Sequence, residues 1–505
     1  MKKKNDKTYK KVKKVSVIVS YVILLLTSVI FVMAKWYGQT FNISFAELYY
    51  TMLSPLKGTG DSTIQQIIEG CIVPILFLWI FITGIYFVML QHKISINVLF
   101  KGKPWSNQYF NKYLMISIVL FCLSICSTIN EIKLLPFLKT ALDKTNIYED
   151  YFVNPNEVKI STNGKTKNII HLYLESMETT YASDKEGGFQ GENNYIPNLT
   201  QLAKENVSFS NSDKLGGFKY LYGAGTTSTA LFSSTSGIPY SFPADSNGGM
   251  TQHEKFAAGT TTLGDILNEY HYNQEFLCGS DSTFGARKKF FEEHGNSTIF
   301  DYYTAIEKKY IPNDYKVWWG FEDTKLYGIA KDEISRLAES DDPFNFTFLT
   351  VDTHHIGGYV CDECENKYDI RLANVIDCAD RQVYDFINWC KQQPFYDNTV
   401  IVISGDHQRM DDILVSGVNS ENRTVYNCII NTDTKAQSET KNRTFTSIDM
   451  FPTTLAAMGF EIEGDQLGLG VNLFSKKETL SEQLGYDYFS NELTKYSKYY
   501  IDHFS

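Results

Sequence analysis

Three long apolar segments near the amino terminus constrain the fold of this 505-residue chain more than any other feature. Val15–Met33 and Cys71–Leu90 contain no charged residue, and each has about the length that crosses a bilayer as a helix. Tyr113–Ile129 is a third uncharged segment and is slightly shorter. The sequence therefore predicts a membrane domain of about three transmembrane helices within residues 1–130.

Two alternatives to this interpretation stay open. A cleaved signal peptide also combines a basic stretch with an apolar run, but Val15–Met33 is long for such a run and no convincing small-residue cleavage site follows it. The third segment, Tyr113–Ile129, is short enough to be a buried helix of a soluble core.

Basic residues set the predicted orientation of the segments. Eight lysines crowd the amino terminus: Lys2, Lys3, Lys4, Lys7, Lys10, Lys11, Lys13 and Lys14. A second basic group lies between the second and third segments: His92, Lys93, Lys101, Lys103 and Lys112. Because basic loops stay in the cytoplasm, both groups are predicted to be cytoplasmic, and everything beyond about residue 130 is predicted to lie outside.

The rest of the chain is predicted to form a connector, residues 131–166, and an extracytoplasmic domain, residues 167–505. The loop between the first two segments contains FAELYYTMLSPLKG, residues 45–58, whose apolar spacing suits a short helix lying at the membrane surface. The net charge of −11 argues against a nucleic-acid-binding protein, which would normally be basic.

Strands and helices alternate in the extracytoplasmic domain. Short apolar runs predict four strands: Ile169–Leu174, Glu275–Cys278, Phe344–Val351 and Thr399–Ser404. Helical patterns lie between or beside them: NLTQLAKEN, TTLGDILNEYH, DTKLYGIAKDEISRLAE and RLANVIDCADRQVYDFINWCKQQ. This alternation predicts an α/β fold with a mainly parallel sheet flanked by helices.

Reactive side chains follow the predicted strands: Glu175 after the first, Asp281 and Arg287 after the second, Asp352, His354 and His355 after the third, Asp406 and His407 after the fourth. Taken singly, each is compatible with a solvated surface loop. Because ligands of parallel α/β sheets bind beyond the carboxyl ends of the strands, the set predicts a shared site at one rim. Carboxylates and imidazole together suit Mn²⁺, Mg²⁺ or Zn²⁺.

A candidate nucleophile lies in LYGAGTTSTALFSSTSGIPYS, which starts at Leu221. Gly223 and Gly225 permit a tight turn, and Thr226 and Thr227 then begin a helix-compatible stretch. A hydroxyl at a helix start meets free amides and the positive end of the helix dipole, which favours attack on a phosphate. The alternative is that these threonines only cap the helix.

Nine cysteines are present, and six of them lie in the predicted outer domain: Cys278, Cys361, Cys364, Cys378, Cys390 and Cys428. CDEC, Cys361 to Cys364, has no second C-x-x-C to complete a four-cysteine zinc site. Outside the cytoplasm a disulfide is the favoured interpretation, with Cys378 as one possible partner, although spacing does not fix the connectivity.

With these residues in view, the chain resembles the phosphoglycerol transferases of the alkaline-phosphatase/sulfatase superfamily, the group that includes lipoteichoic acid synthase. The resemblance covers roughly residues 165–475, and it is closest to the enzymes that modify osmoregulated periplasmic glucans. Six segments carry it, in this order: LESMETTY, GAGTTSTALFSSTSGIP, CGSDSTFGARKKFFEEHG, TVDTHHIGGY, SGDHQRM and TSIDMFPTTLAAMG.

The resemblance implies roles for individual residues. A divalent metal, usually manganese, with Mg²⁺ or Zn²⁺ also possible, would be bound by four of them: Glu175, Thr227, Asp406 and His407. Thr227 would also be the nucleophile, with Thr226 as the neighbour that is easily confused with it.

The remaining positions match residues near the substrate. Arg287 matches an arginine that contacts the phosphate or glycerol group, and His354 matches a histidine near the leaving or entering oxygen. His355 follows it, as in the glucan-modifying relatives, and Asp281 is a further candidate for substrate binding.

The implied activity is the transfer of phosphoglycerol from phosphatidylglycerol to an extracytoplasmic glycan or glycolipid through a glycerophospho-threonine intermediate. Lipoteichoic acid synthesis, phosphoethanolamine transfer and a non-enzymatic membrane sensor or scaffold stay open as alternatives. Cys278 and Gly285 stand where the lipoteichoic acid enzymes have a histidine and a tryptophan, which counts against chain extension. A sulfatase C/S-x-P-x-R motif is not found.

Overall fold

A computed structural model of the chain describes residues 2–40, 67–91, 112–162, 166–241 and 255–504, with short pieces at 65, 99–100, 103–104 and 164. The chain divides into two compact units, residues 1–45 with 61–138 and residues 46–60 with 139–505. The predicted surface helix at residues 45–58 lies outside the described residues, as does most of the basic loop around Lys101.

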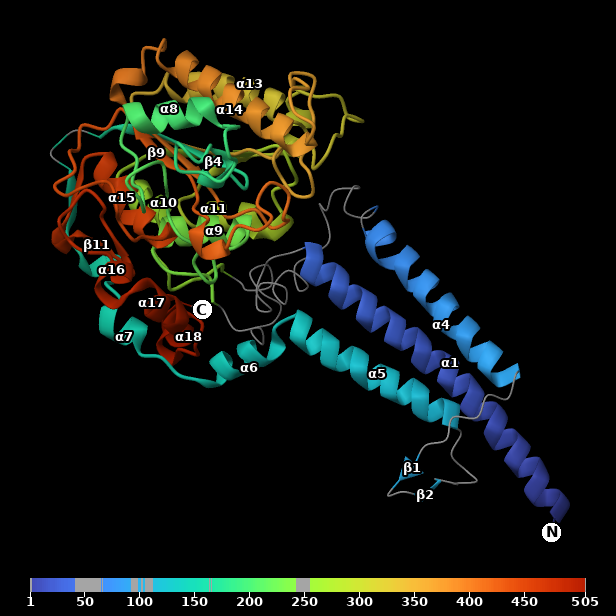
Figure 1. The fold of residues 1–505 in the computed structure, drawn as a ribbon. Helices are drawn as coiled ribbons and strands as arrows, with labels where there is room; N and C mark the ends of the chain where they lie inside the picture. The colour runs from blue at the N-terminus through green and yellow to red at the C-terminus, as the bar shows by residue number, and fades with distance from the viewer. Residues whose placement is uncertain are drawn as a thin grey trace. The chain divides into compact units, whose positions relative to one another are not determined.

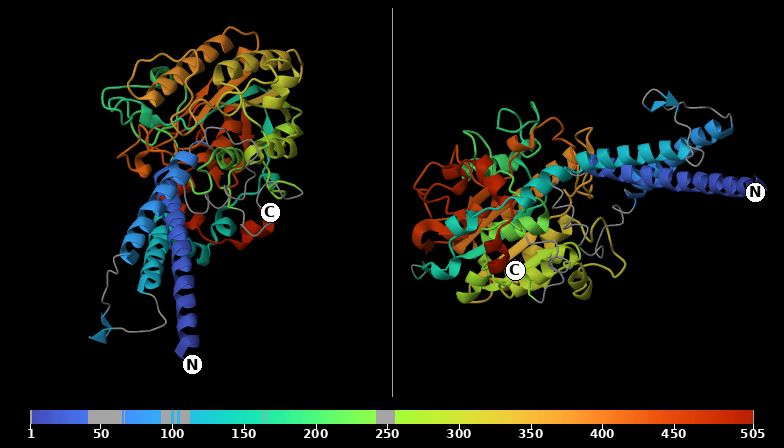
Figure 2. Two further views of the ribbon diagram at one scale, coloured as in Figure 1. Left: turned by 90° about the vertical axis from the view of Figure 1, so that its right-hand side faces the viewer. Right: turned by 90° about the horizontal axis from the view of Figure 1, so that it is seen from below.

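The smaller unit contains three helices that are long and apolar enough to cross a membrane. They are α1 (Lys2–Thr40), α4 (Val73–Gln91), which continues a π-helical turn at Ile68–Ile72, and α5 (Lys112–Glu131). The three helices run side by side in all views (Figures 1 and 2), and α1 packs against both others. All three predicted segments are thus helical.

The third segment does not have the surface of a soluble core helix. Its side chains Val119 and Leu123 are 51% and 60% exposed, so α5 presents large apolar side chains outward. Lys35 near the end of α1 forms a 2.6 Å ion pair with Glu131, the last residue of α5. An outward apolar surface favours contact with lipid over burial in a core.

The larger unit is built around a six-stranded sheet with the order β6-β5-β7-β4-β8-β9. The first five strands in this order are parallel, and β9 is antiparallel to β8. Their bounds are β4 (Asn168–Leu174), β5 (Asn273–Cys278), β6 (Thr298–Phe300), β7 (Phe344–Leu349), β8 (Thr399–Gly405) and β9 (Asn427–Ile430).

Helices cover both faces of this sheet (Figure 1). One face packs on α8 (Pro197–Glu205), α13 (Asp323–Leu337) and α14 (Arg371–Cys390). The other packs on α9 (Thr227–Ser236), α10 (Leu263–Glu269), α11 (Arg287–Glu293) and α15 (Met450–Ala457). Because alternate strand side chains enter opposite cores, the central strands are apolar on both sides, which is why they appear as short continuous apolar runs.

Shorter elements complete the unit. β3 (Ile160–Thr162) pairs antiparallel with β10 (Phe460–Ile462), and β11 (Gln466–Leu467) with β12 (Gly470–Val471). The remaining described helices and strands are β1 (Leu99–Phe100), β2 (Lys103–Pro104), α6 (Leu134–Leu142), α7 (Ile147–Tyr151), α12 (Tyr302–Glu307), α16 (Leu480–Leu484), α17 (Tyr486–Leu493) and α18 (Lys498–Phe504).

The predicted α/β class and mainly parallel sheet are confirmed. The four predicted strands correspond to β4, β5, β7 and β8, and the four helical stretches to α8, α10, α13 and α14. The strands β6 and β9 were not predicted, because three and four residues are too few to show a pattern.

Candidate active site

Glu175 and Asp406 directly follow the neighbouring strands β4 and β8 and lie side by side. The pairing of β4 with β8 places Leu174 opposite Gly405, and the Asp406 amide donates to the Leu174 carbonyl at 3.2 Å. His407 follows directly, and all three acidic or imidazole side chains are buried. The two strand ends therefore deliver two carboxylates and one imidazole to the same place, as the sequence predicted.

Hydrogen bonds orient the three ligand-type side chains. His407 Nδ1 lies 2.7 Å from the Gln408 carbonyl, which can only accept, so Nδ1 carries the proton and Nε2 keeps its lone pair. That Nε2 lies 3.4 Å from Asp406 Oδ2 and 3.6 Å from Glu175 Oε1. Asp406 Oδ1 accepts from the amides of Ser176 at 2.7 Å and His407 at 2.8 Å.

The other oxygen of Asp406 gives the strongest indication of a metal site. Oδ2 is buried and has no hydrogen-bond partner, although a buried carboxylate oxygen without a partner is costly. Glu175, Asp406 and His407 each offer one ligand atom within 4.8 Å of the others. Two carboxylate oxygens and one imidazole nitrogen fit a divalent cation of the Mn²⁺, Mg²⁺ or Zn²⁺ type.

The pKa values of the two carboxylates shift in opposite directions. Burial, followed by the charge of Glu175, raises the pKa of Asp406 to about 7. Burial by itself also raises the pKa of Glu175, but the nearby His354 and His407 rings and two hydrogen bonds outweigh it, so this pKa lies below its ordinary value. A divalent cation would favour the charged form of both groups.

The two candidate threonines have different partners. Thr226 precedes α9 and its Oγ1 lies 2.9 Å from Thr229 Oγ1, which also accepts from the Thr226 amide at 3.0 Å. This is a capping arrangement at the helix start. Thr227 Oγ1 instead donates to Glu175 Oε2 at 3.0 Å and lies 3.4 Å from His407 Nε2. Thr226 is therefore the residue that caps α9. Thr227 faces the acidic cluster, which is formed by Glu175, Asp406 and His407.

The loop before α9 turns sharply to bring Thr227 there. Gly223 has a φ of +76°, and a Cβ added to it would lie 2.4 Å from the Tyr240 carbonyl oxygen. A side chain at this position would clash with backbone, so the glycine is required by both the turn and the close approach.

A small cleft of about 30 Å³ lies beside the acidic cluster. Its lining includes Glu175, Thr227, Ser228, Arg287, Trp319 and His354. Arg287 is buried at the start of α11. Its Nε donates to the Phe284 carbonyl at 3.0 Å, and its Nη2 donates to Ser280 Oγ at 3.0 Å and to the Asp281 carbonyl at 2.8 Å. The guanidinium is thus held in place by a cage of oxygen acceptors at the cleft wall.

His354 presents a neutral imidazole to the cleft. Its Nδ1 donates to the His355 carbonyl at 2.7 Å, which leaves Nε2 unprotonated, and burial lowers the pKa of the ring. The ring packs against Trp319, with 4.6 Å between the centroids. A neutral imidazole with one open nitrogen can accept a proton from a hydroxyl or return it.

His355 and Asp281 are placed differently. The His355 ring stacks on His354 at 4.3 Å, and burial lowers its pKa. Asp281 Oδ1 accepts from the amide and the hydroxyl of Thr283, at 2.9 and 2.6 Å, so its carboxylate stabilises the turn that precedes Arg287. Neither residue lines the cleft, and their direct contact with substrate stays a prediction.

Sequence reasoning missed Trp319 and a buried charge network. Trp319 comes from a loop without any periodic pattern, so no signal in the sequence marked it. Behind the site, Arg423 donates through Nε to Glu178 Oε2 at 2.9 Å and also contacts Oε1. Arg409 pairs with Asp411 and donates from its backbone amide to Glu178 at 2.6 Å.

One residue, Thr353, connects this buried charge network to Glu175 of the acidic cluster. Arg409 Nη1 donates to the Thr353 carbonyl at 2.8 Å, and the Thr353 hydroxyl donates to the Glu175 carbonyl at 2.5 Å. The four charges are two acids and two arginines, so the network is balanced overall, and it supports the backbone on which Glu175 sits.

The predicted disulfide is not formed. All nine cysteines are unbonded. Cys361 Sγ lies 3.5 Å from Cys364 Sγ and 3.8 Å from Cys378 Sγ, well beyond the roughly 2.05 Å of a sulfur–sulfur bond. The expectation that Cys378 lies beside the CDEC segment is nevertheless correct.

Comparisons with known proteins match the larger unit. A family model described as Sulfatase matches residues 167–460. Phosphoglycerol transferase I of Salmonella choleraesuis (strain SC-B67) is 31% identical over 328 residues, which are 62% of this chain and 40% of that protein. Phosphoglycerol transferase I of Xanthomonas campestris pv. campestris (strain B100) is 30% identical over 256 residues, which are 50% and 35% of the two chains. The chain thus spans well under half the length of these relatives.

Two solved structures share lower identity. The lipoteichoic acid synthase LtaP from Listeria monocytogenes is 17% identical with a TM-score of 0.47, covering 63% of this chain and 79% of that one. The lipooligosaccharide phosphoethanolamine transferase A from Neisseria meningitidis is 12% identical with a TM-score of 0.47, covering 88% and 84%.

Proposed function

The chain belongs to the sulfatase family, and from this premise we propose that it is a metal-dependent phosphoglycerol transferase of the alkaline-phosphatase superfamily. The proposed donor is phosphatidylglycerol, and the proposed acceptor is an extracytoplasmic glycan or glycolipid. The observation that carries the proposal is the Thr227 hydroxyl, which donates to Glu175 beside His407 at the start of α9. The relatives named phosphoglycerol transferase I support the reaction class.

Four residues would hold the cation: Glu175, Thr227, Asp406 and His407. When bound there, Mn²⁺ or a similar ion would lower the pKa of the Thr227 hydroxyl and shield negative charge on the phosphate. The buried, unpartnered Asp406 Oδ2 and the lone pair on His407 Nε2 are the atoms of this chain that fit such an ion.

The first step is a displacement at phosphorus by Thr227 Oγ1. The hydroxyl proton is directed at Glu175 Oε2, and a bond forms between Oγ1 and phosphorus. The bond from phosphorus to the diacylglycerol oxygen breaks, and that oxygen gains the proton that Thr227 released. Diacylglycerol stays in the bilayer, and a glycerophosphoryl group remains on Thr227.

The second step returns the threonine to its free form. An acceptor hydroxyl attacks the same phosphorus, the bond to Thr227 Oγ1 breaks, and Oγ1 regains a proton. His354 Nε2 accepts the proton of the entering hydroxyl, because its Nδ1 is already committed to the His355 carbonyl. Arg287 lines the cleft, and because its Nε and Nη2 donate to the protein, Nη1 is the nitrogen that would donate to a non-bridging phosphate oxygen.

The membrane placement belongs to the same proposal. Three helices long enough to span a bilayer would keep the chain at the membrane that contains the donor lipid. The amino terminus is proposed to be cytoplasmic and the catalytic unit extracytoplasmic, because the basic residues cluster at the amino terminus and between the second and third helices.

A labelled-donor experiment tests the proposal. The full chain in detergent micelles with Mn²⁺ receives phosphatidylglycerol labelled in the headgroup glycerol, together with a glucan acceptor. The expected products are unlabelled diacylglycerol and a labelled glucan. A ladder of polyglycerolphosphate would indicate lipoteichoic acid synthesis, and transfer only from phosphatidylethanolamine would indicate the phosphoethanolamine reaction. No donor cleavage at all would favour a sensor or scaffold.

A further inference from the structure

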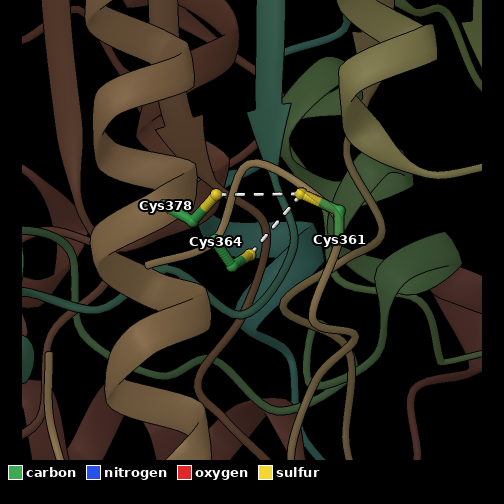
Figure 3. Close-up of side chains that lie close together, drawn as sticks. All are labelled: Cys361, Cys364 and Cys378. Atoms are coloured by element: carbon green, nitrogen blue, oxygen red, sulfur yellow. Dashed lines mark hydrogen bonds between the residues drawn. The ribbon is translucent and has the colours of Figure 1, made fainter. Parts of the chain in front are cut away.

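Three cysteines converge at a place apart from the acidic cluster. Cys361 and Cys364 lie in the loop that follows β7, and Cys378 lies on α14 (Figure 3). Figure 3 shows the three sulfur atoms pointing toward one another, with dashed lines from Cys361 to each of the other two. Their sulfur atoms all lie within 4.8 Å of one another, and Cys361 and Cys378 are buried.

The spacing of the sulfur atoms is that of ligands around a shared ion. Cys361 Sγ lies 3.5 Å from Cys364 Sγ and 3.8 Å from Cys378 Sγ. In a tetrahedral zinc site with Zn–S bonds of about 2.3 Å, two sulfur ligands are about 3.8 Å apart. A disulfide between any two of these cysteines would leave the third thiol unpaired beside it.

Two polar side chains donate toward the Cys361 sulfur. Thr324 Oγ1 donates to Cys361 Sγ at 3.6 Å, and Gln382 Nε2 approaches it at 3.8 Å. The same amide group contacts the carboxylate of Glu363 at 3.4 Å. Hydrogen-bond donors to the sulfur stabilise a thiolate.

We propose that Cys361, Cys364 and Cys378 bind one Zn²⁺ ion, with water as the fourth ligand. Binding forms three zinc–sulfur bonds and releases the three thiol protons to solvent, and no oxidant is needed. An ion bound by two cysteines of the loop and one of α14 would clamp the loop to the helix.

The clamp would act on the segment that carries His354. The loop between β7 and α14 contains His354, and its Gly358 amide donates to the His354 carbonyl at 3.1 Å. Arg371 at the start of α14 donates to the Gly358 carbonyl at 2.8 Å. This hydrogen bond attaches the loop to the start of α14. The proposed ion, bound by the three cysteines, would attach the loop to α14 a second time, at Cys378. The ion would therefore fix the position of His354 without touching the reacting groups.

Zinc content of the full chain tests the proposal. Cys378→Ser removes one ligand, and Cys390→Ser is the matched control, because Cys390 is a buried cysteine of the same helix outside the cluster. Both are made in an Asp406→Asn background, which weakens the proposed catalytic metal site, so the two sites are counted separately. We expect the Cys378→Ser chain to hold one zinc equivalent fewer than the Cys390→Ser chain.

X-ray absorption at the zinc edge gives a second measurement that needs no cysteine variant. In the Asp406→Asn chain we expect zinc–sulfur distances of about 2.3 Å from three sulfur atoms. Equal zinc contents in the two cysteine variants, zinc with nitrogen and oxygen ligands only, or a disulfide among the three cysteines in peptide mapping under non-reducing conditions would overturn the proposal. If only the proposed catalytic site loses its metal, the difference in zinc content between the Cys378→Ser and Cys390→Ser chains does not change.

Discussion

The Thr227 hydroxyl donates a 3.0 Å hydrogen bond to Glu175 Oε2, although the two residues lie 52 positions apart in the chain. Glu175 directly follows the central strand β4, and Thr227 begins α9, so the bond joins the end of a strand to the start of a helix. The glycine turn at Gly223 makes this approach possible. The relationship supports Thr227 as the proposed nucleophile and leaves the cap to Thr226.

Substitution of the two threonines should therefore separate chemistry from stability. We expect Thr227→Ala to reduce diacylglycerol release from phosphatidylglycerol by roughly a thousandfold or more, because no nucleophile remains. Thr226→Ala should cost about 1 kcal/mol of stability through the lost cap and change the rate by only a few fold. Equal losses of rate in the two variants would contradict this assignment.

Removal of a proposed acidic metal ligand should lower the metal content of the chain and the rate of the metal-dependent reaction. We expect Asp406→Asn to lower Mn²⁺ content and to reduce the rate at saturating Mn²⁺ by roughly a hundredfold or more, because Oδ2 is lost as a charged ligand. Asp412→Asn is the control, since Asp412 is an exposed acid of the same loop. Chelation should abolish the wild-type rate and added Mn²⁺ should restore it. A rate that survives chelation would argue against a metal centre.

The buried charge network should stabilise the site more than surface pairs do. Arg423→Met leaves the fully buried Glu178 carboxylate without its arginine. We expect a loss of about 3–5 kcal/mol, since a buried charge is then uncompensated. Lys288→Met removes an i,i+4 pair whose side chains are about half exposed, and should cost well under about 1 kcal/mol. Thermal unfolding of the chain in micelles compares the two, and equal unfolding temperatures would contradict the expectation.

His171 should make the unfolding free energy depend on pH. It is buried in the middle of β4, and burial lowers its pKa from 6.5 to about 3. Below pH 6.5 the unfolded chain binds a proton that the folded chain does not, so this stability is present above 6.5 and is lost as pH falls toward 3.

His171→Phe removes this contribution. Between pH 6.5 and 4.5 the wild-type chain should lose about 2 kcal/mol more of its unfolding free energy than the variant does. Denaturant unfolding at the two pH values measures the difference. If the wild-type and His171→Phe chains lose stability in parallel, the ring is protonated in the folded state.

Much of this architecture could be read from local patterns. β4, β5, β7 and β8 are apolar on both faces, so they appear as short apolar runs, and the reactive residues stand directly after them. Since parallel strands end at one rim, Glu175, Asp406 and His407 could be placed together before any coordinates were known.

Other features depend on the folded chain and leave no local signal. No local pattern separates Thr226 from Thr227; the family resemblance favoured Thr227, and the turn before α9 places its hydroxyl at Glu175. Trp319 reaches the cleft from an irregular loop. Glu178 and Arg423 lie 245 positions apart, so their pairing follows from the docking of two loops and not from any spacing.

The central claim is that Thr227 carries the phosphoglycerol group between donor and acceptor. Mass spectrometry of the full chain, incubated with phosphatidylglycerol and Mn²⁺ but without acceptor, tests it most directly. The account predicts a mass increase of one glycerophosphoryl group, located by peptide fragmentation on Thr227 and absent from Thr227→Ala. An adduct on Thr226 or on another residue, or donor cleavage with no adduct on the chain at any time, would contradict it.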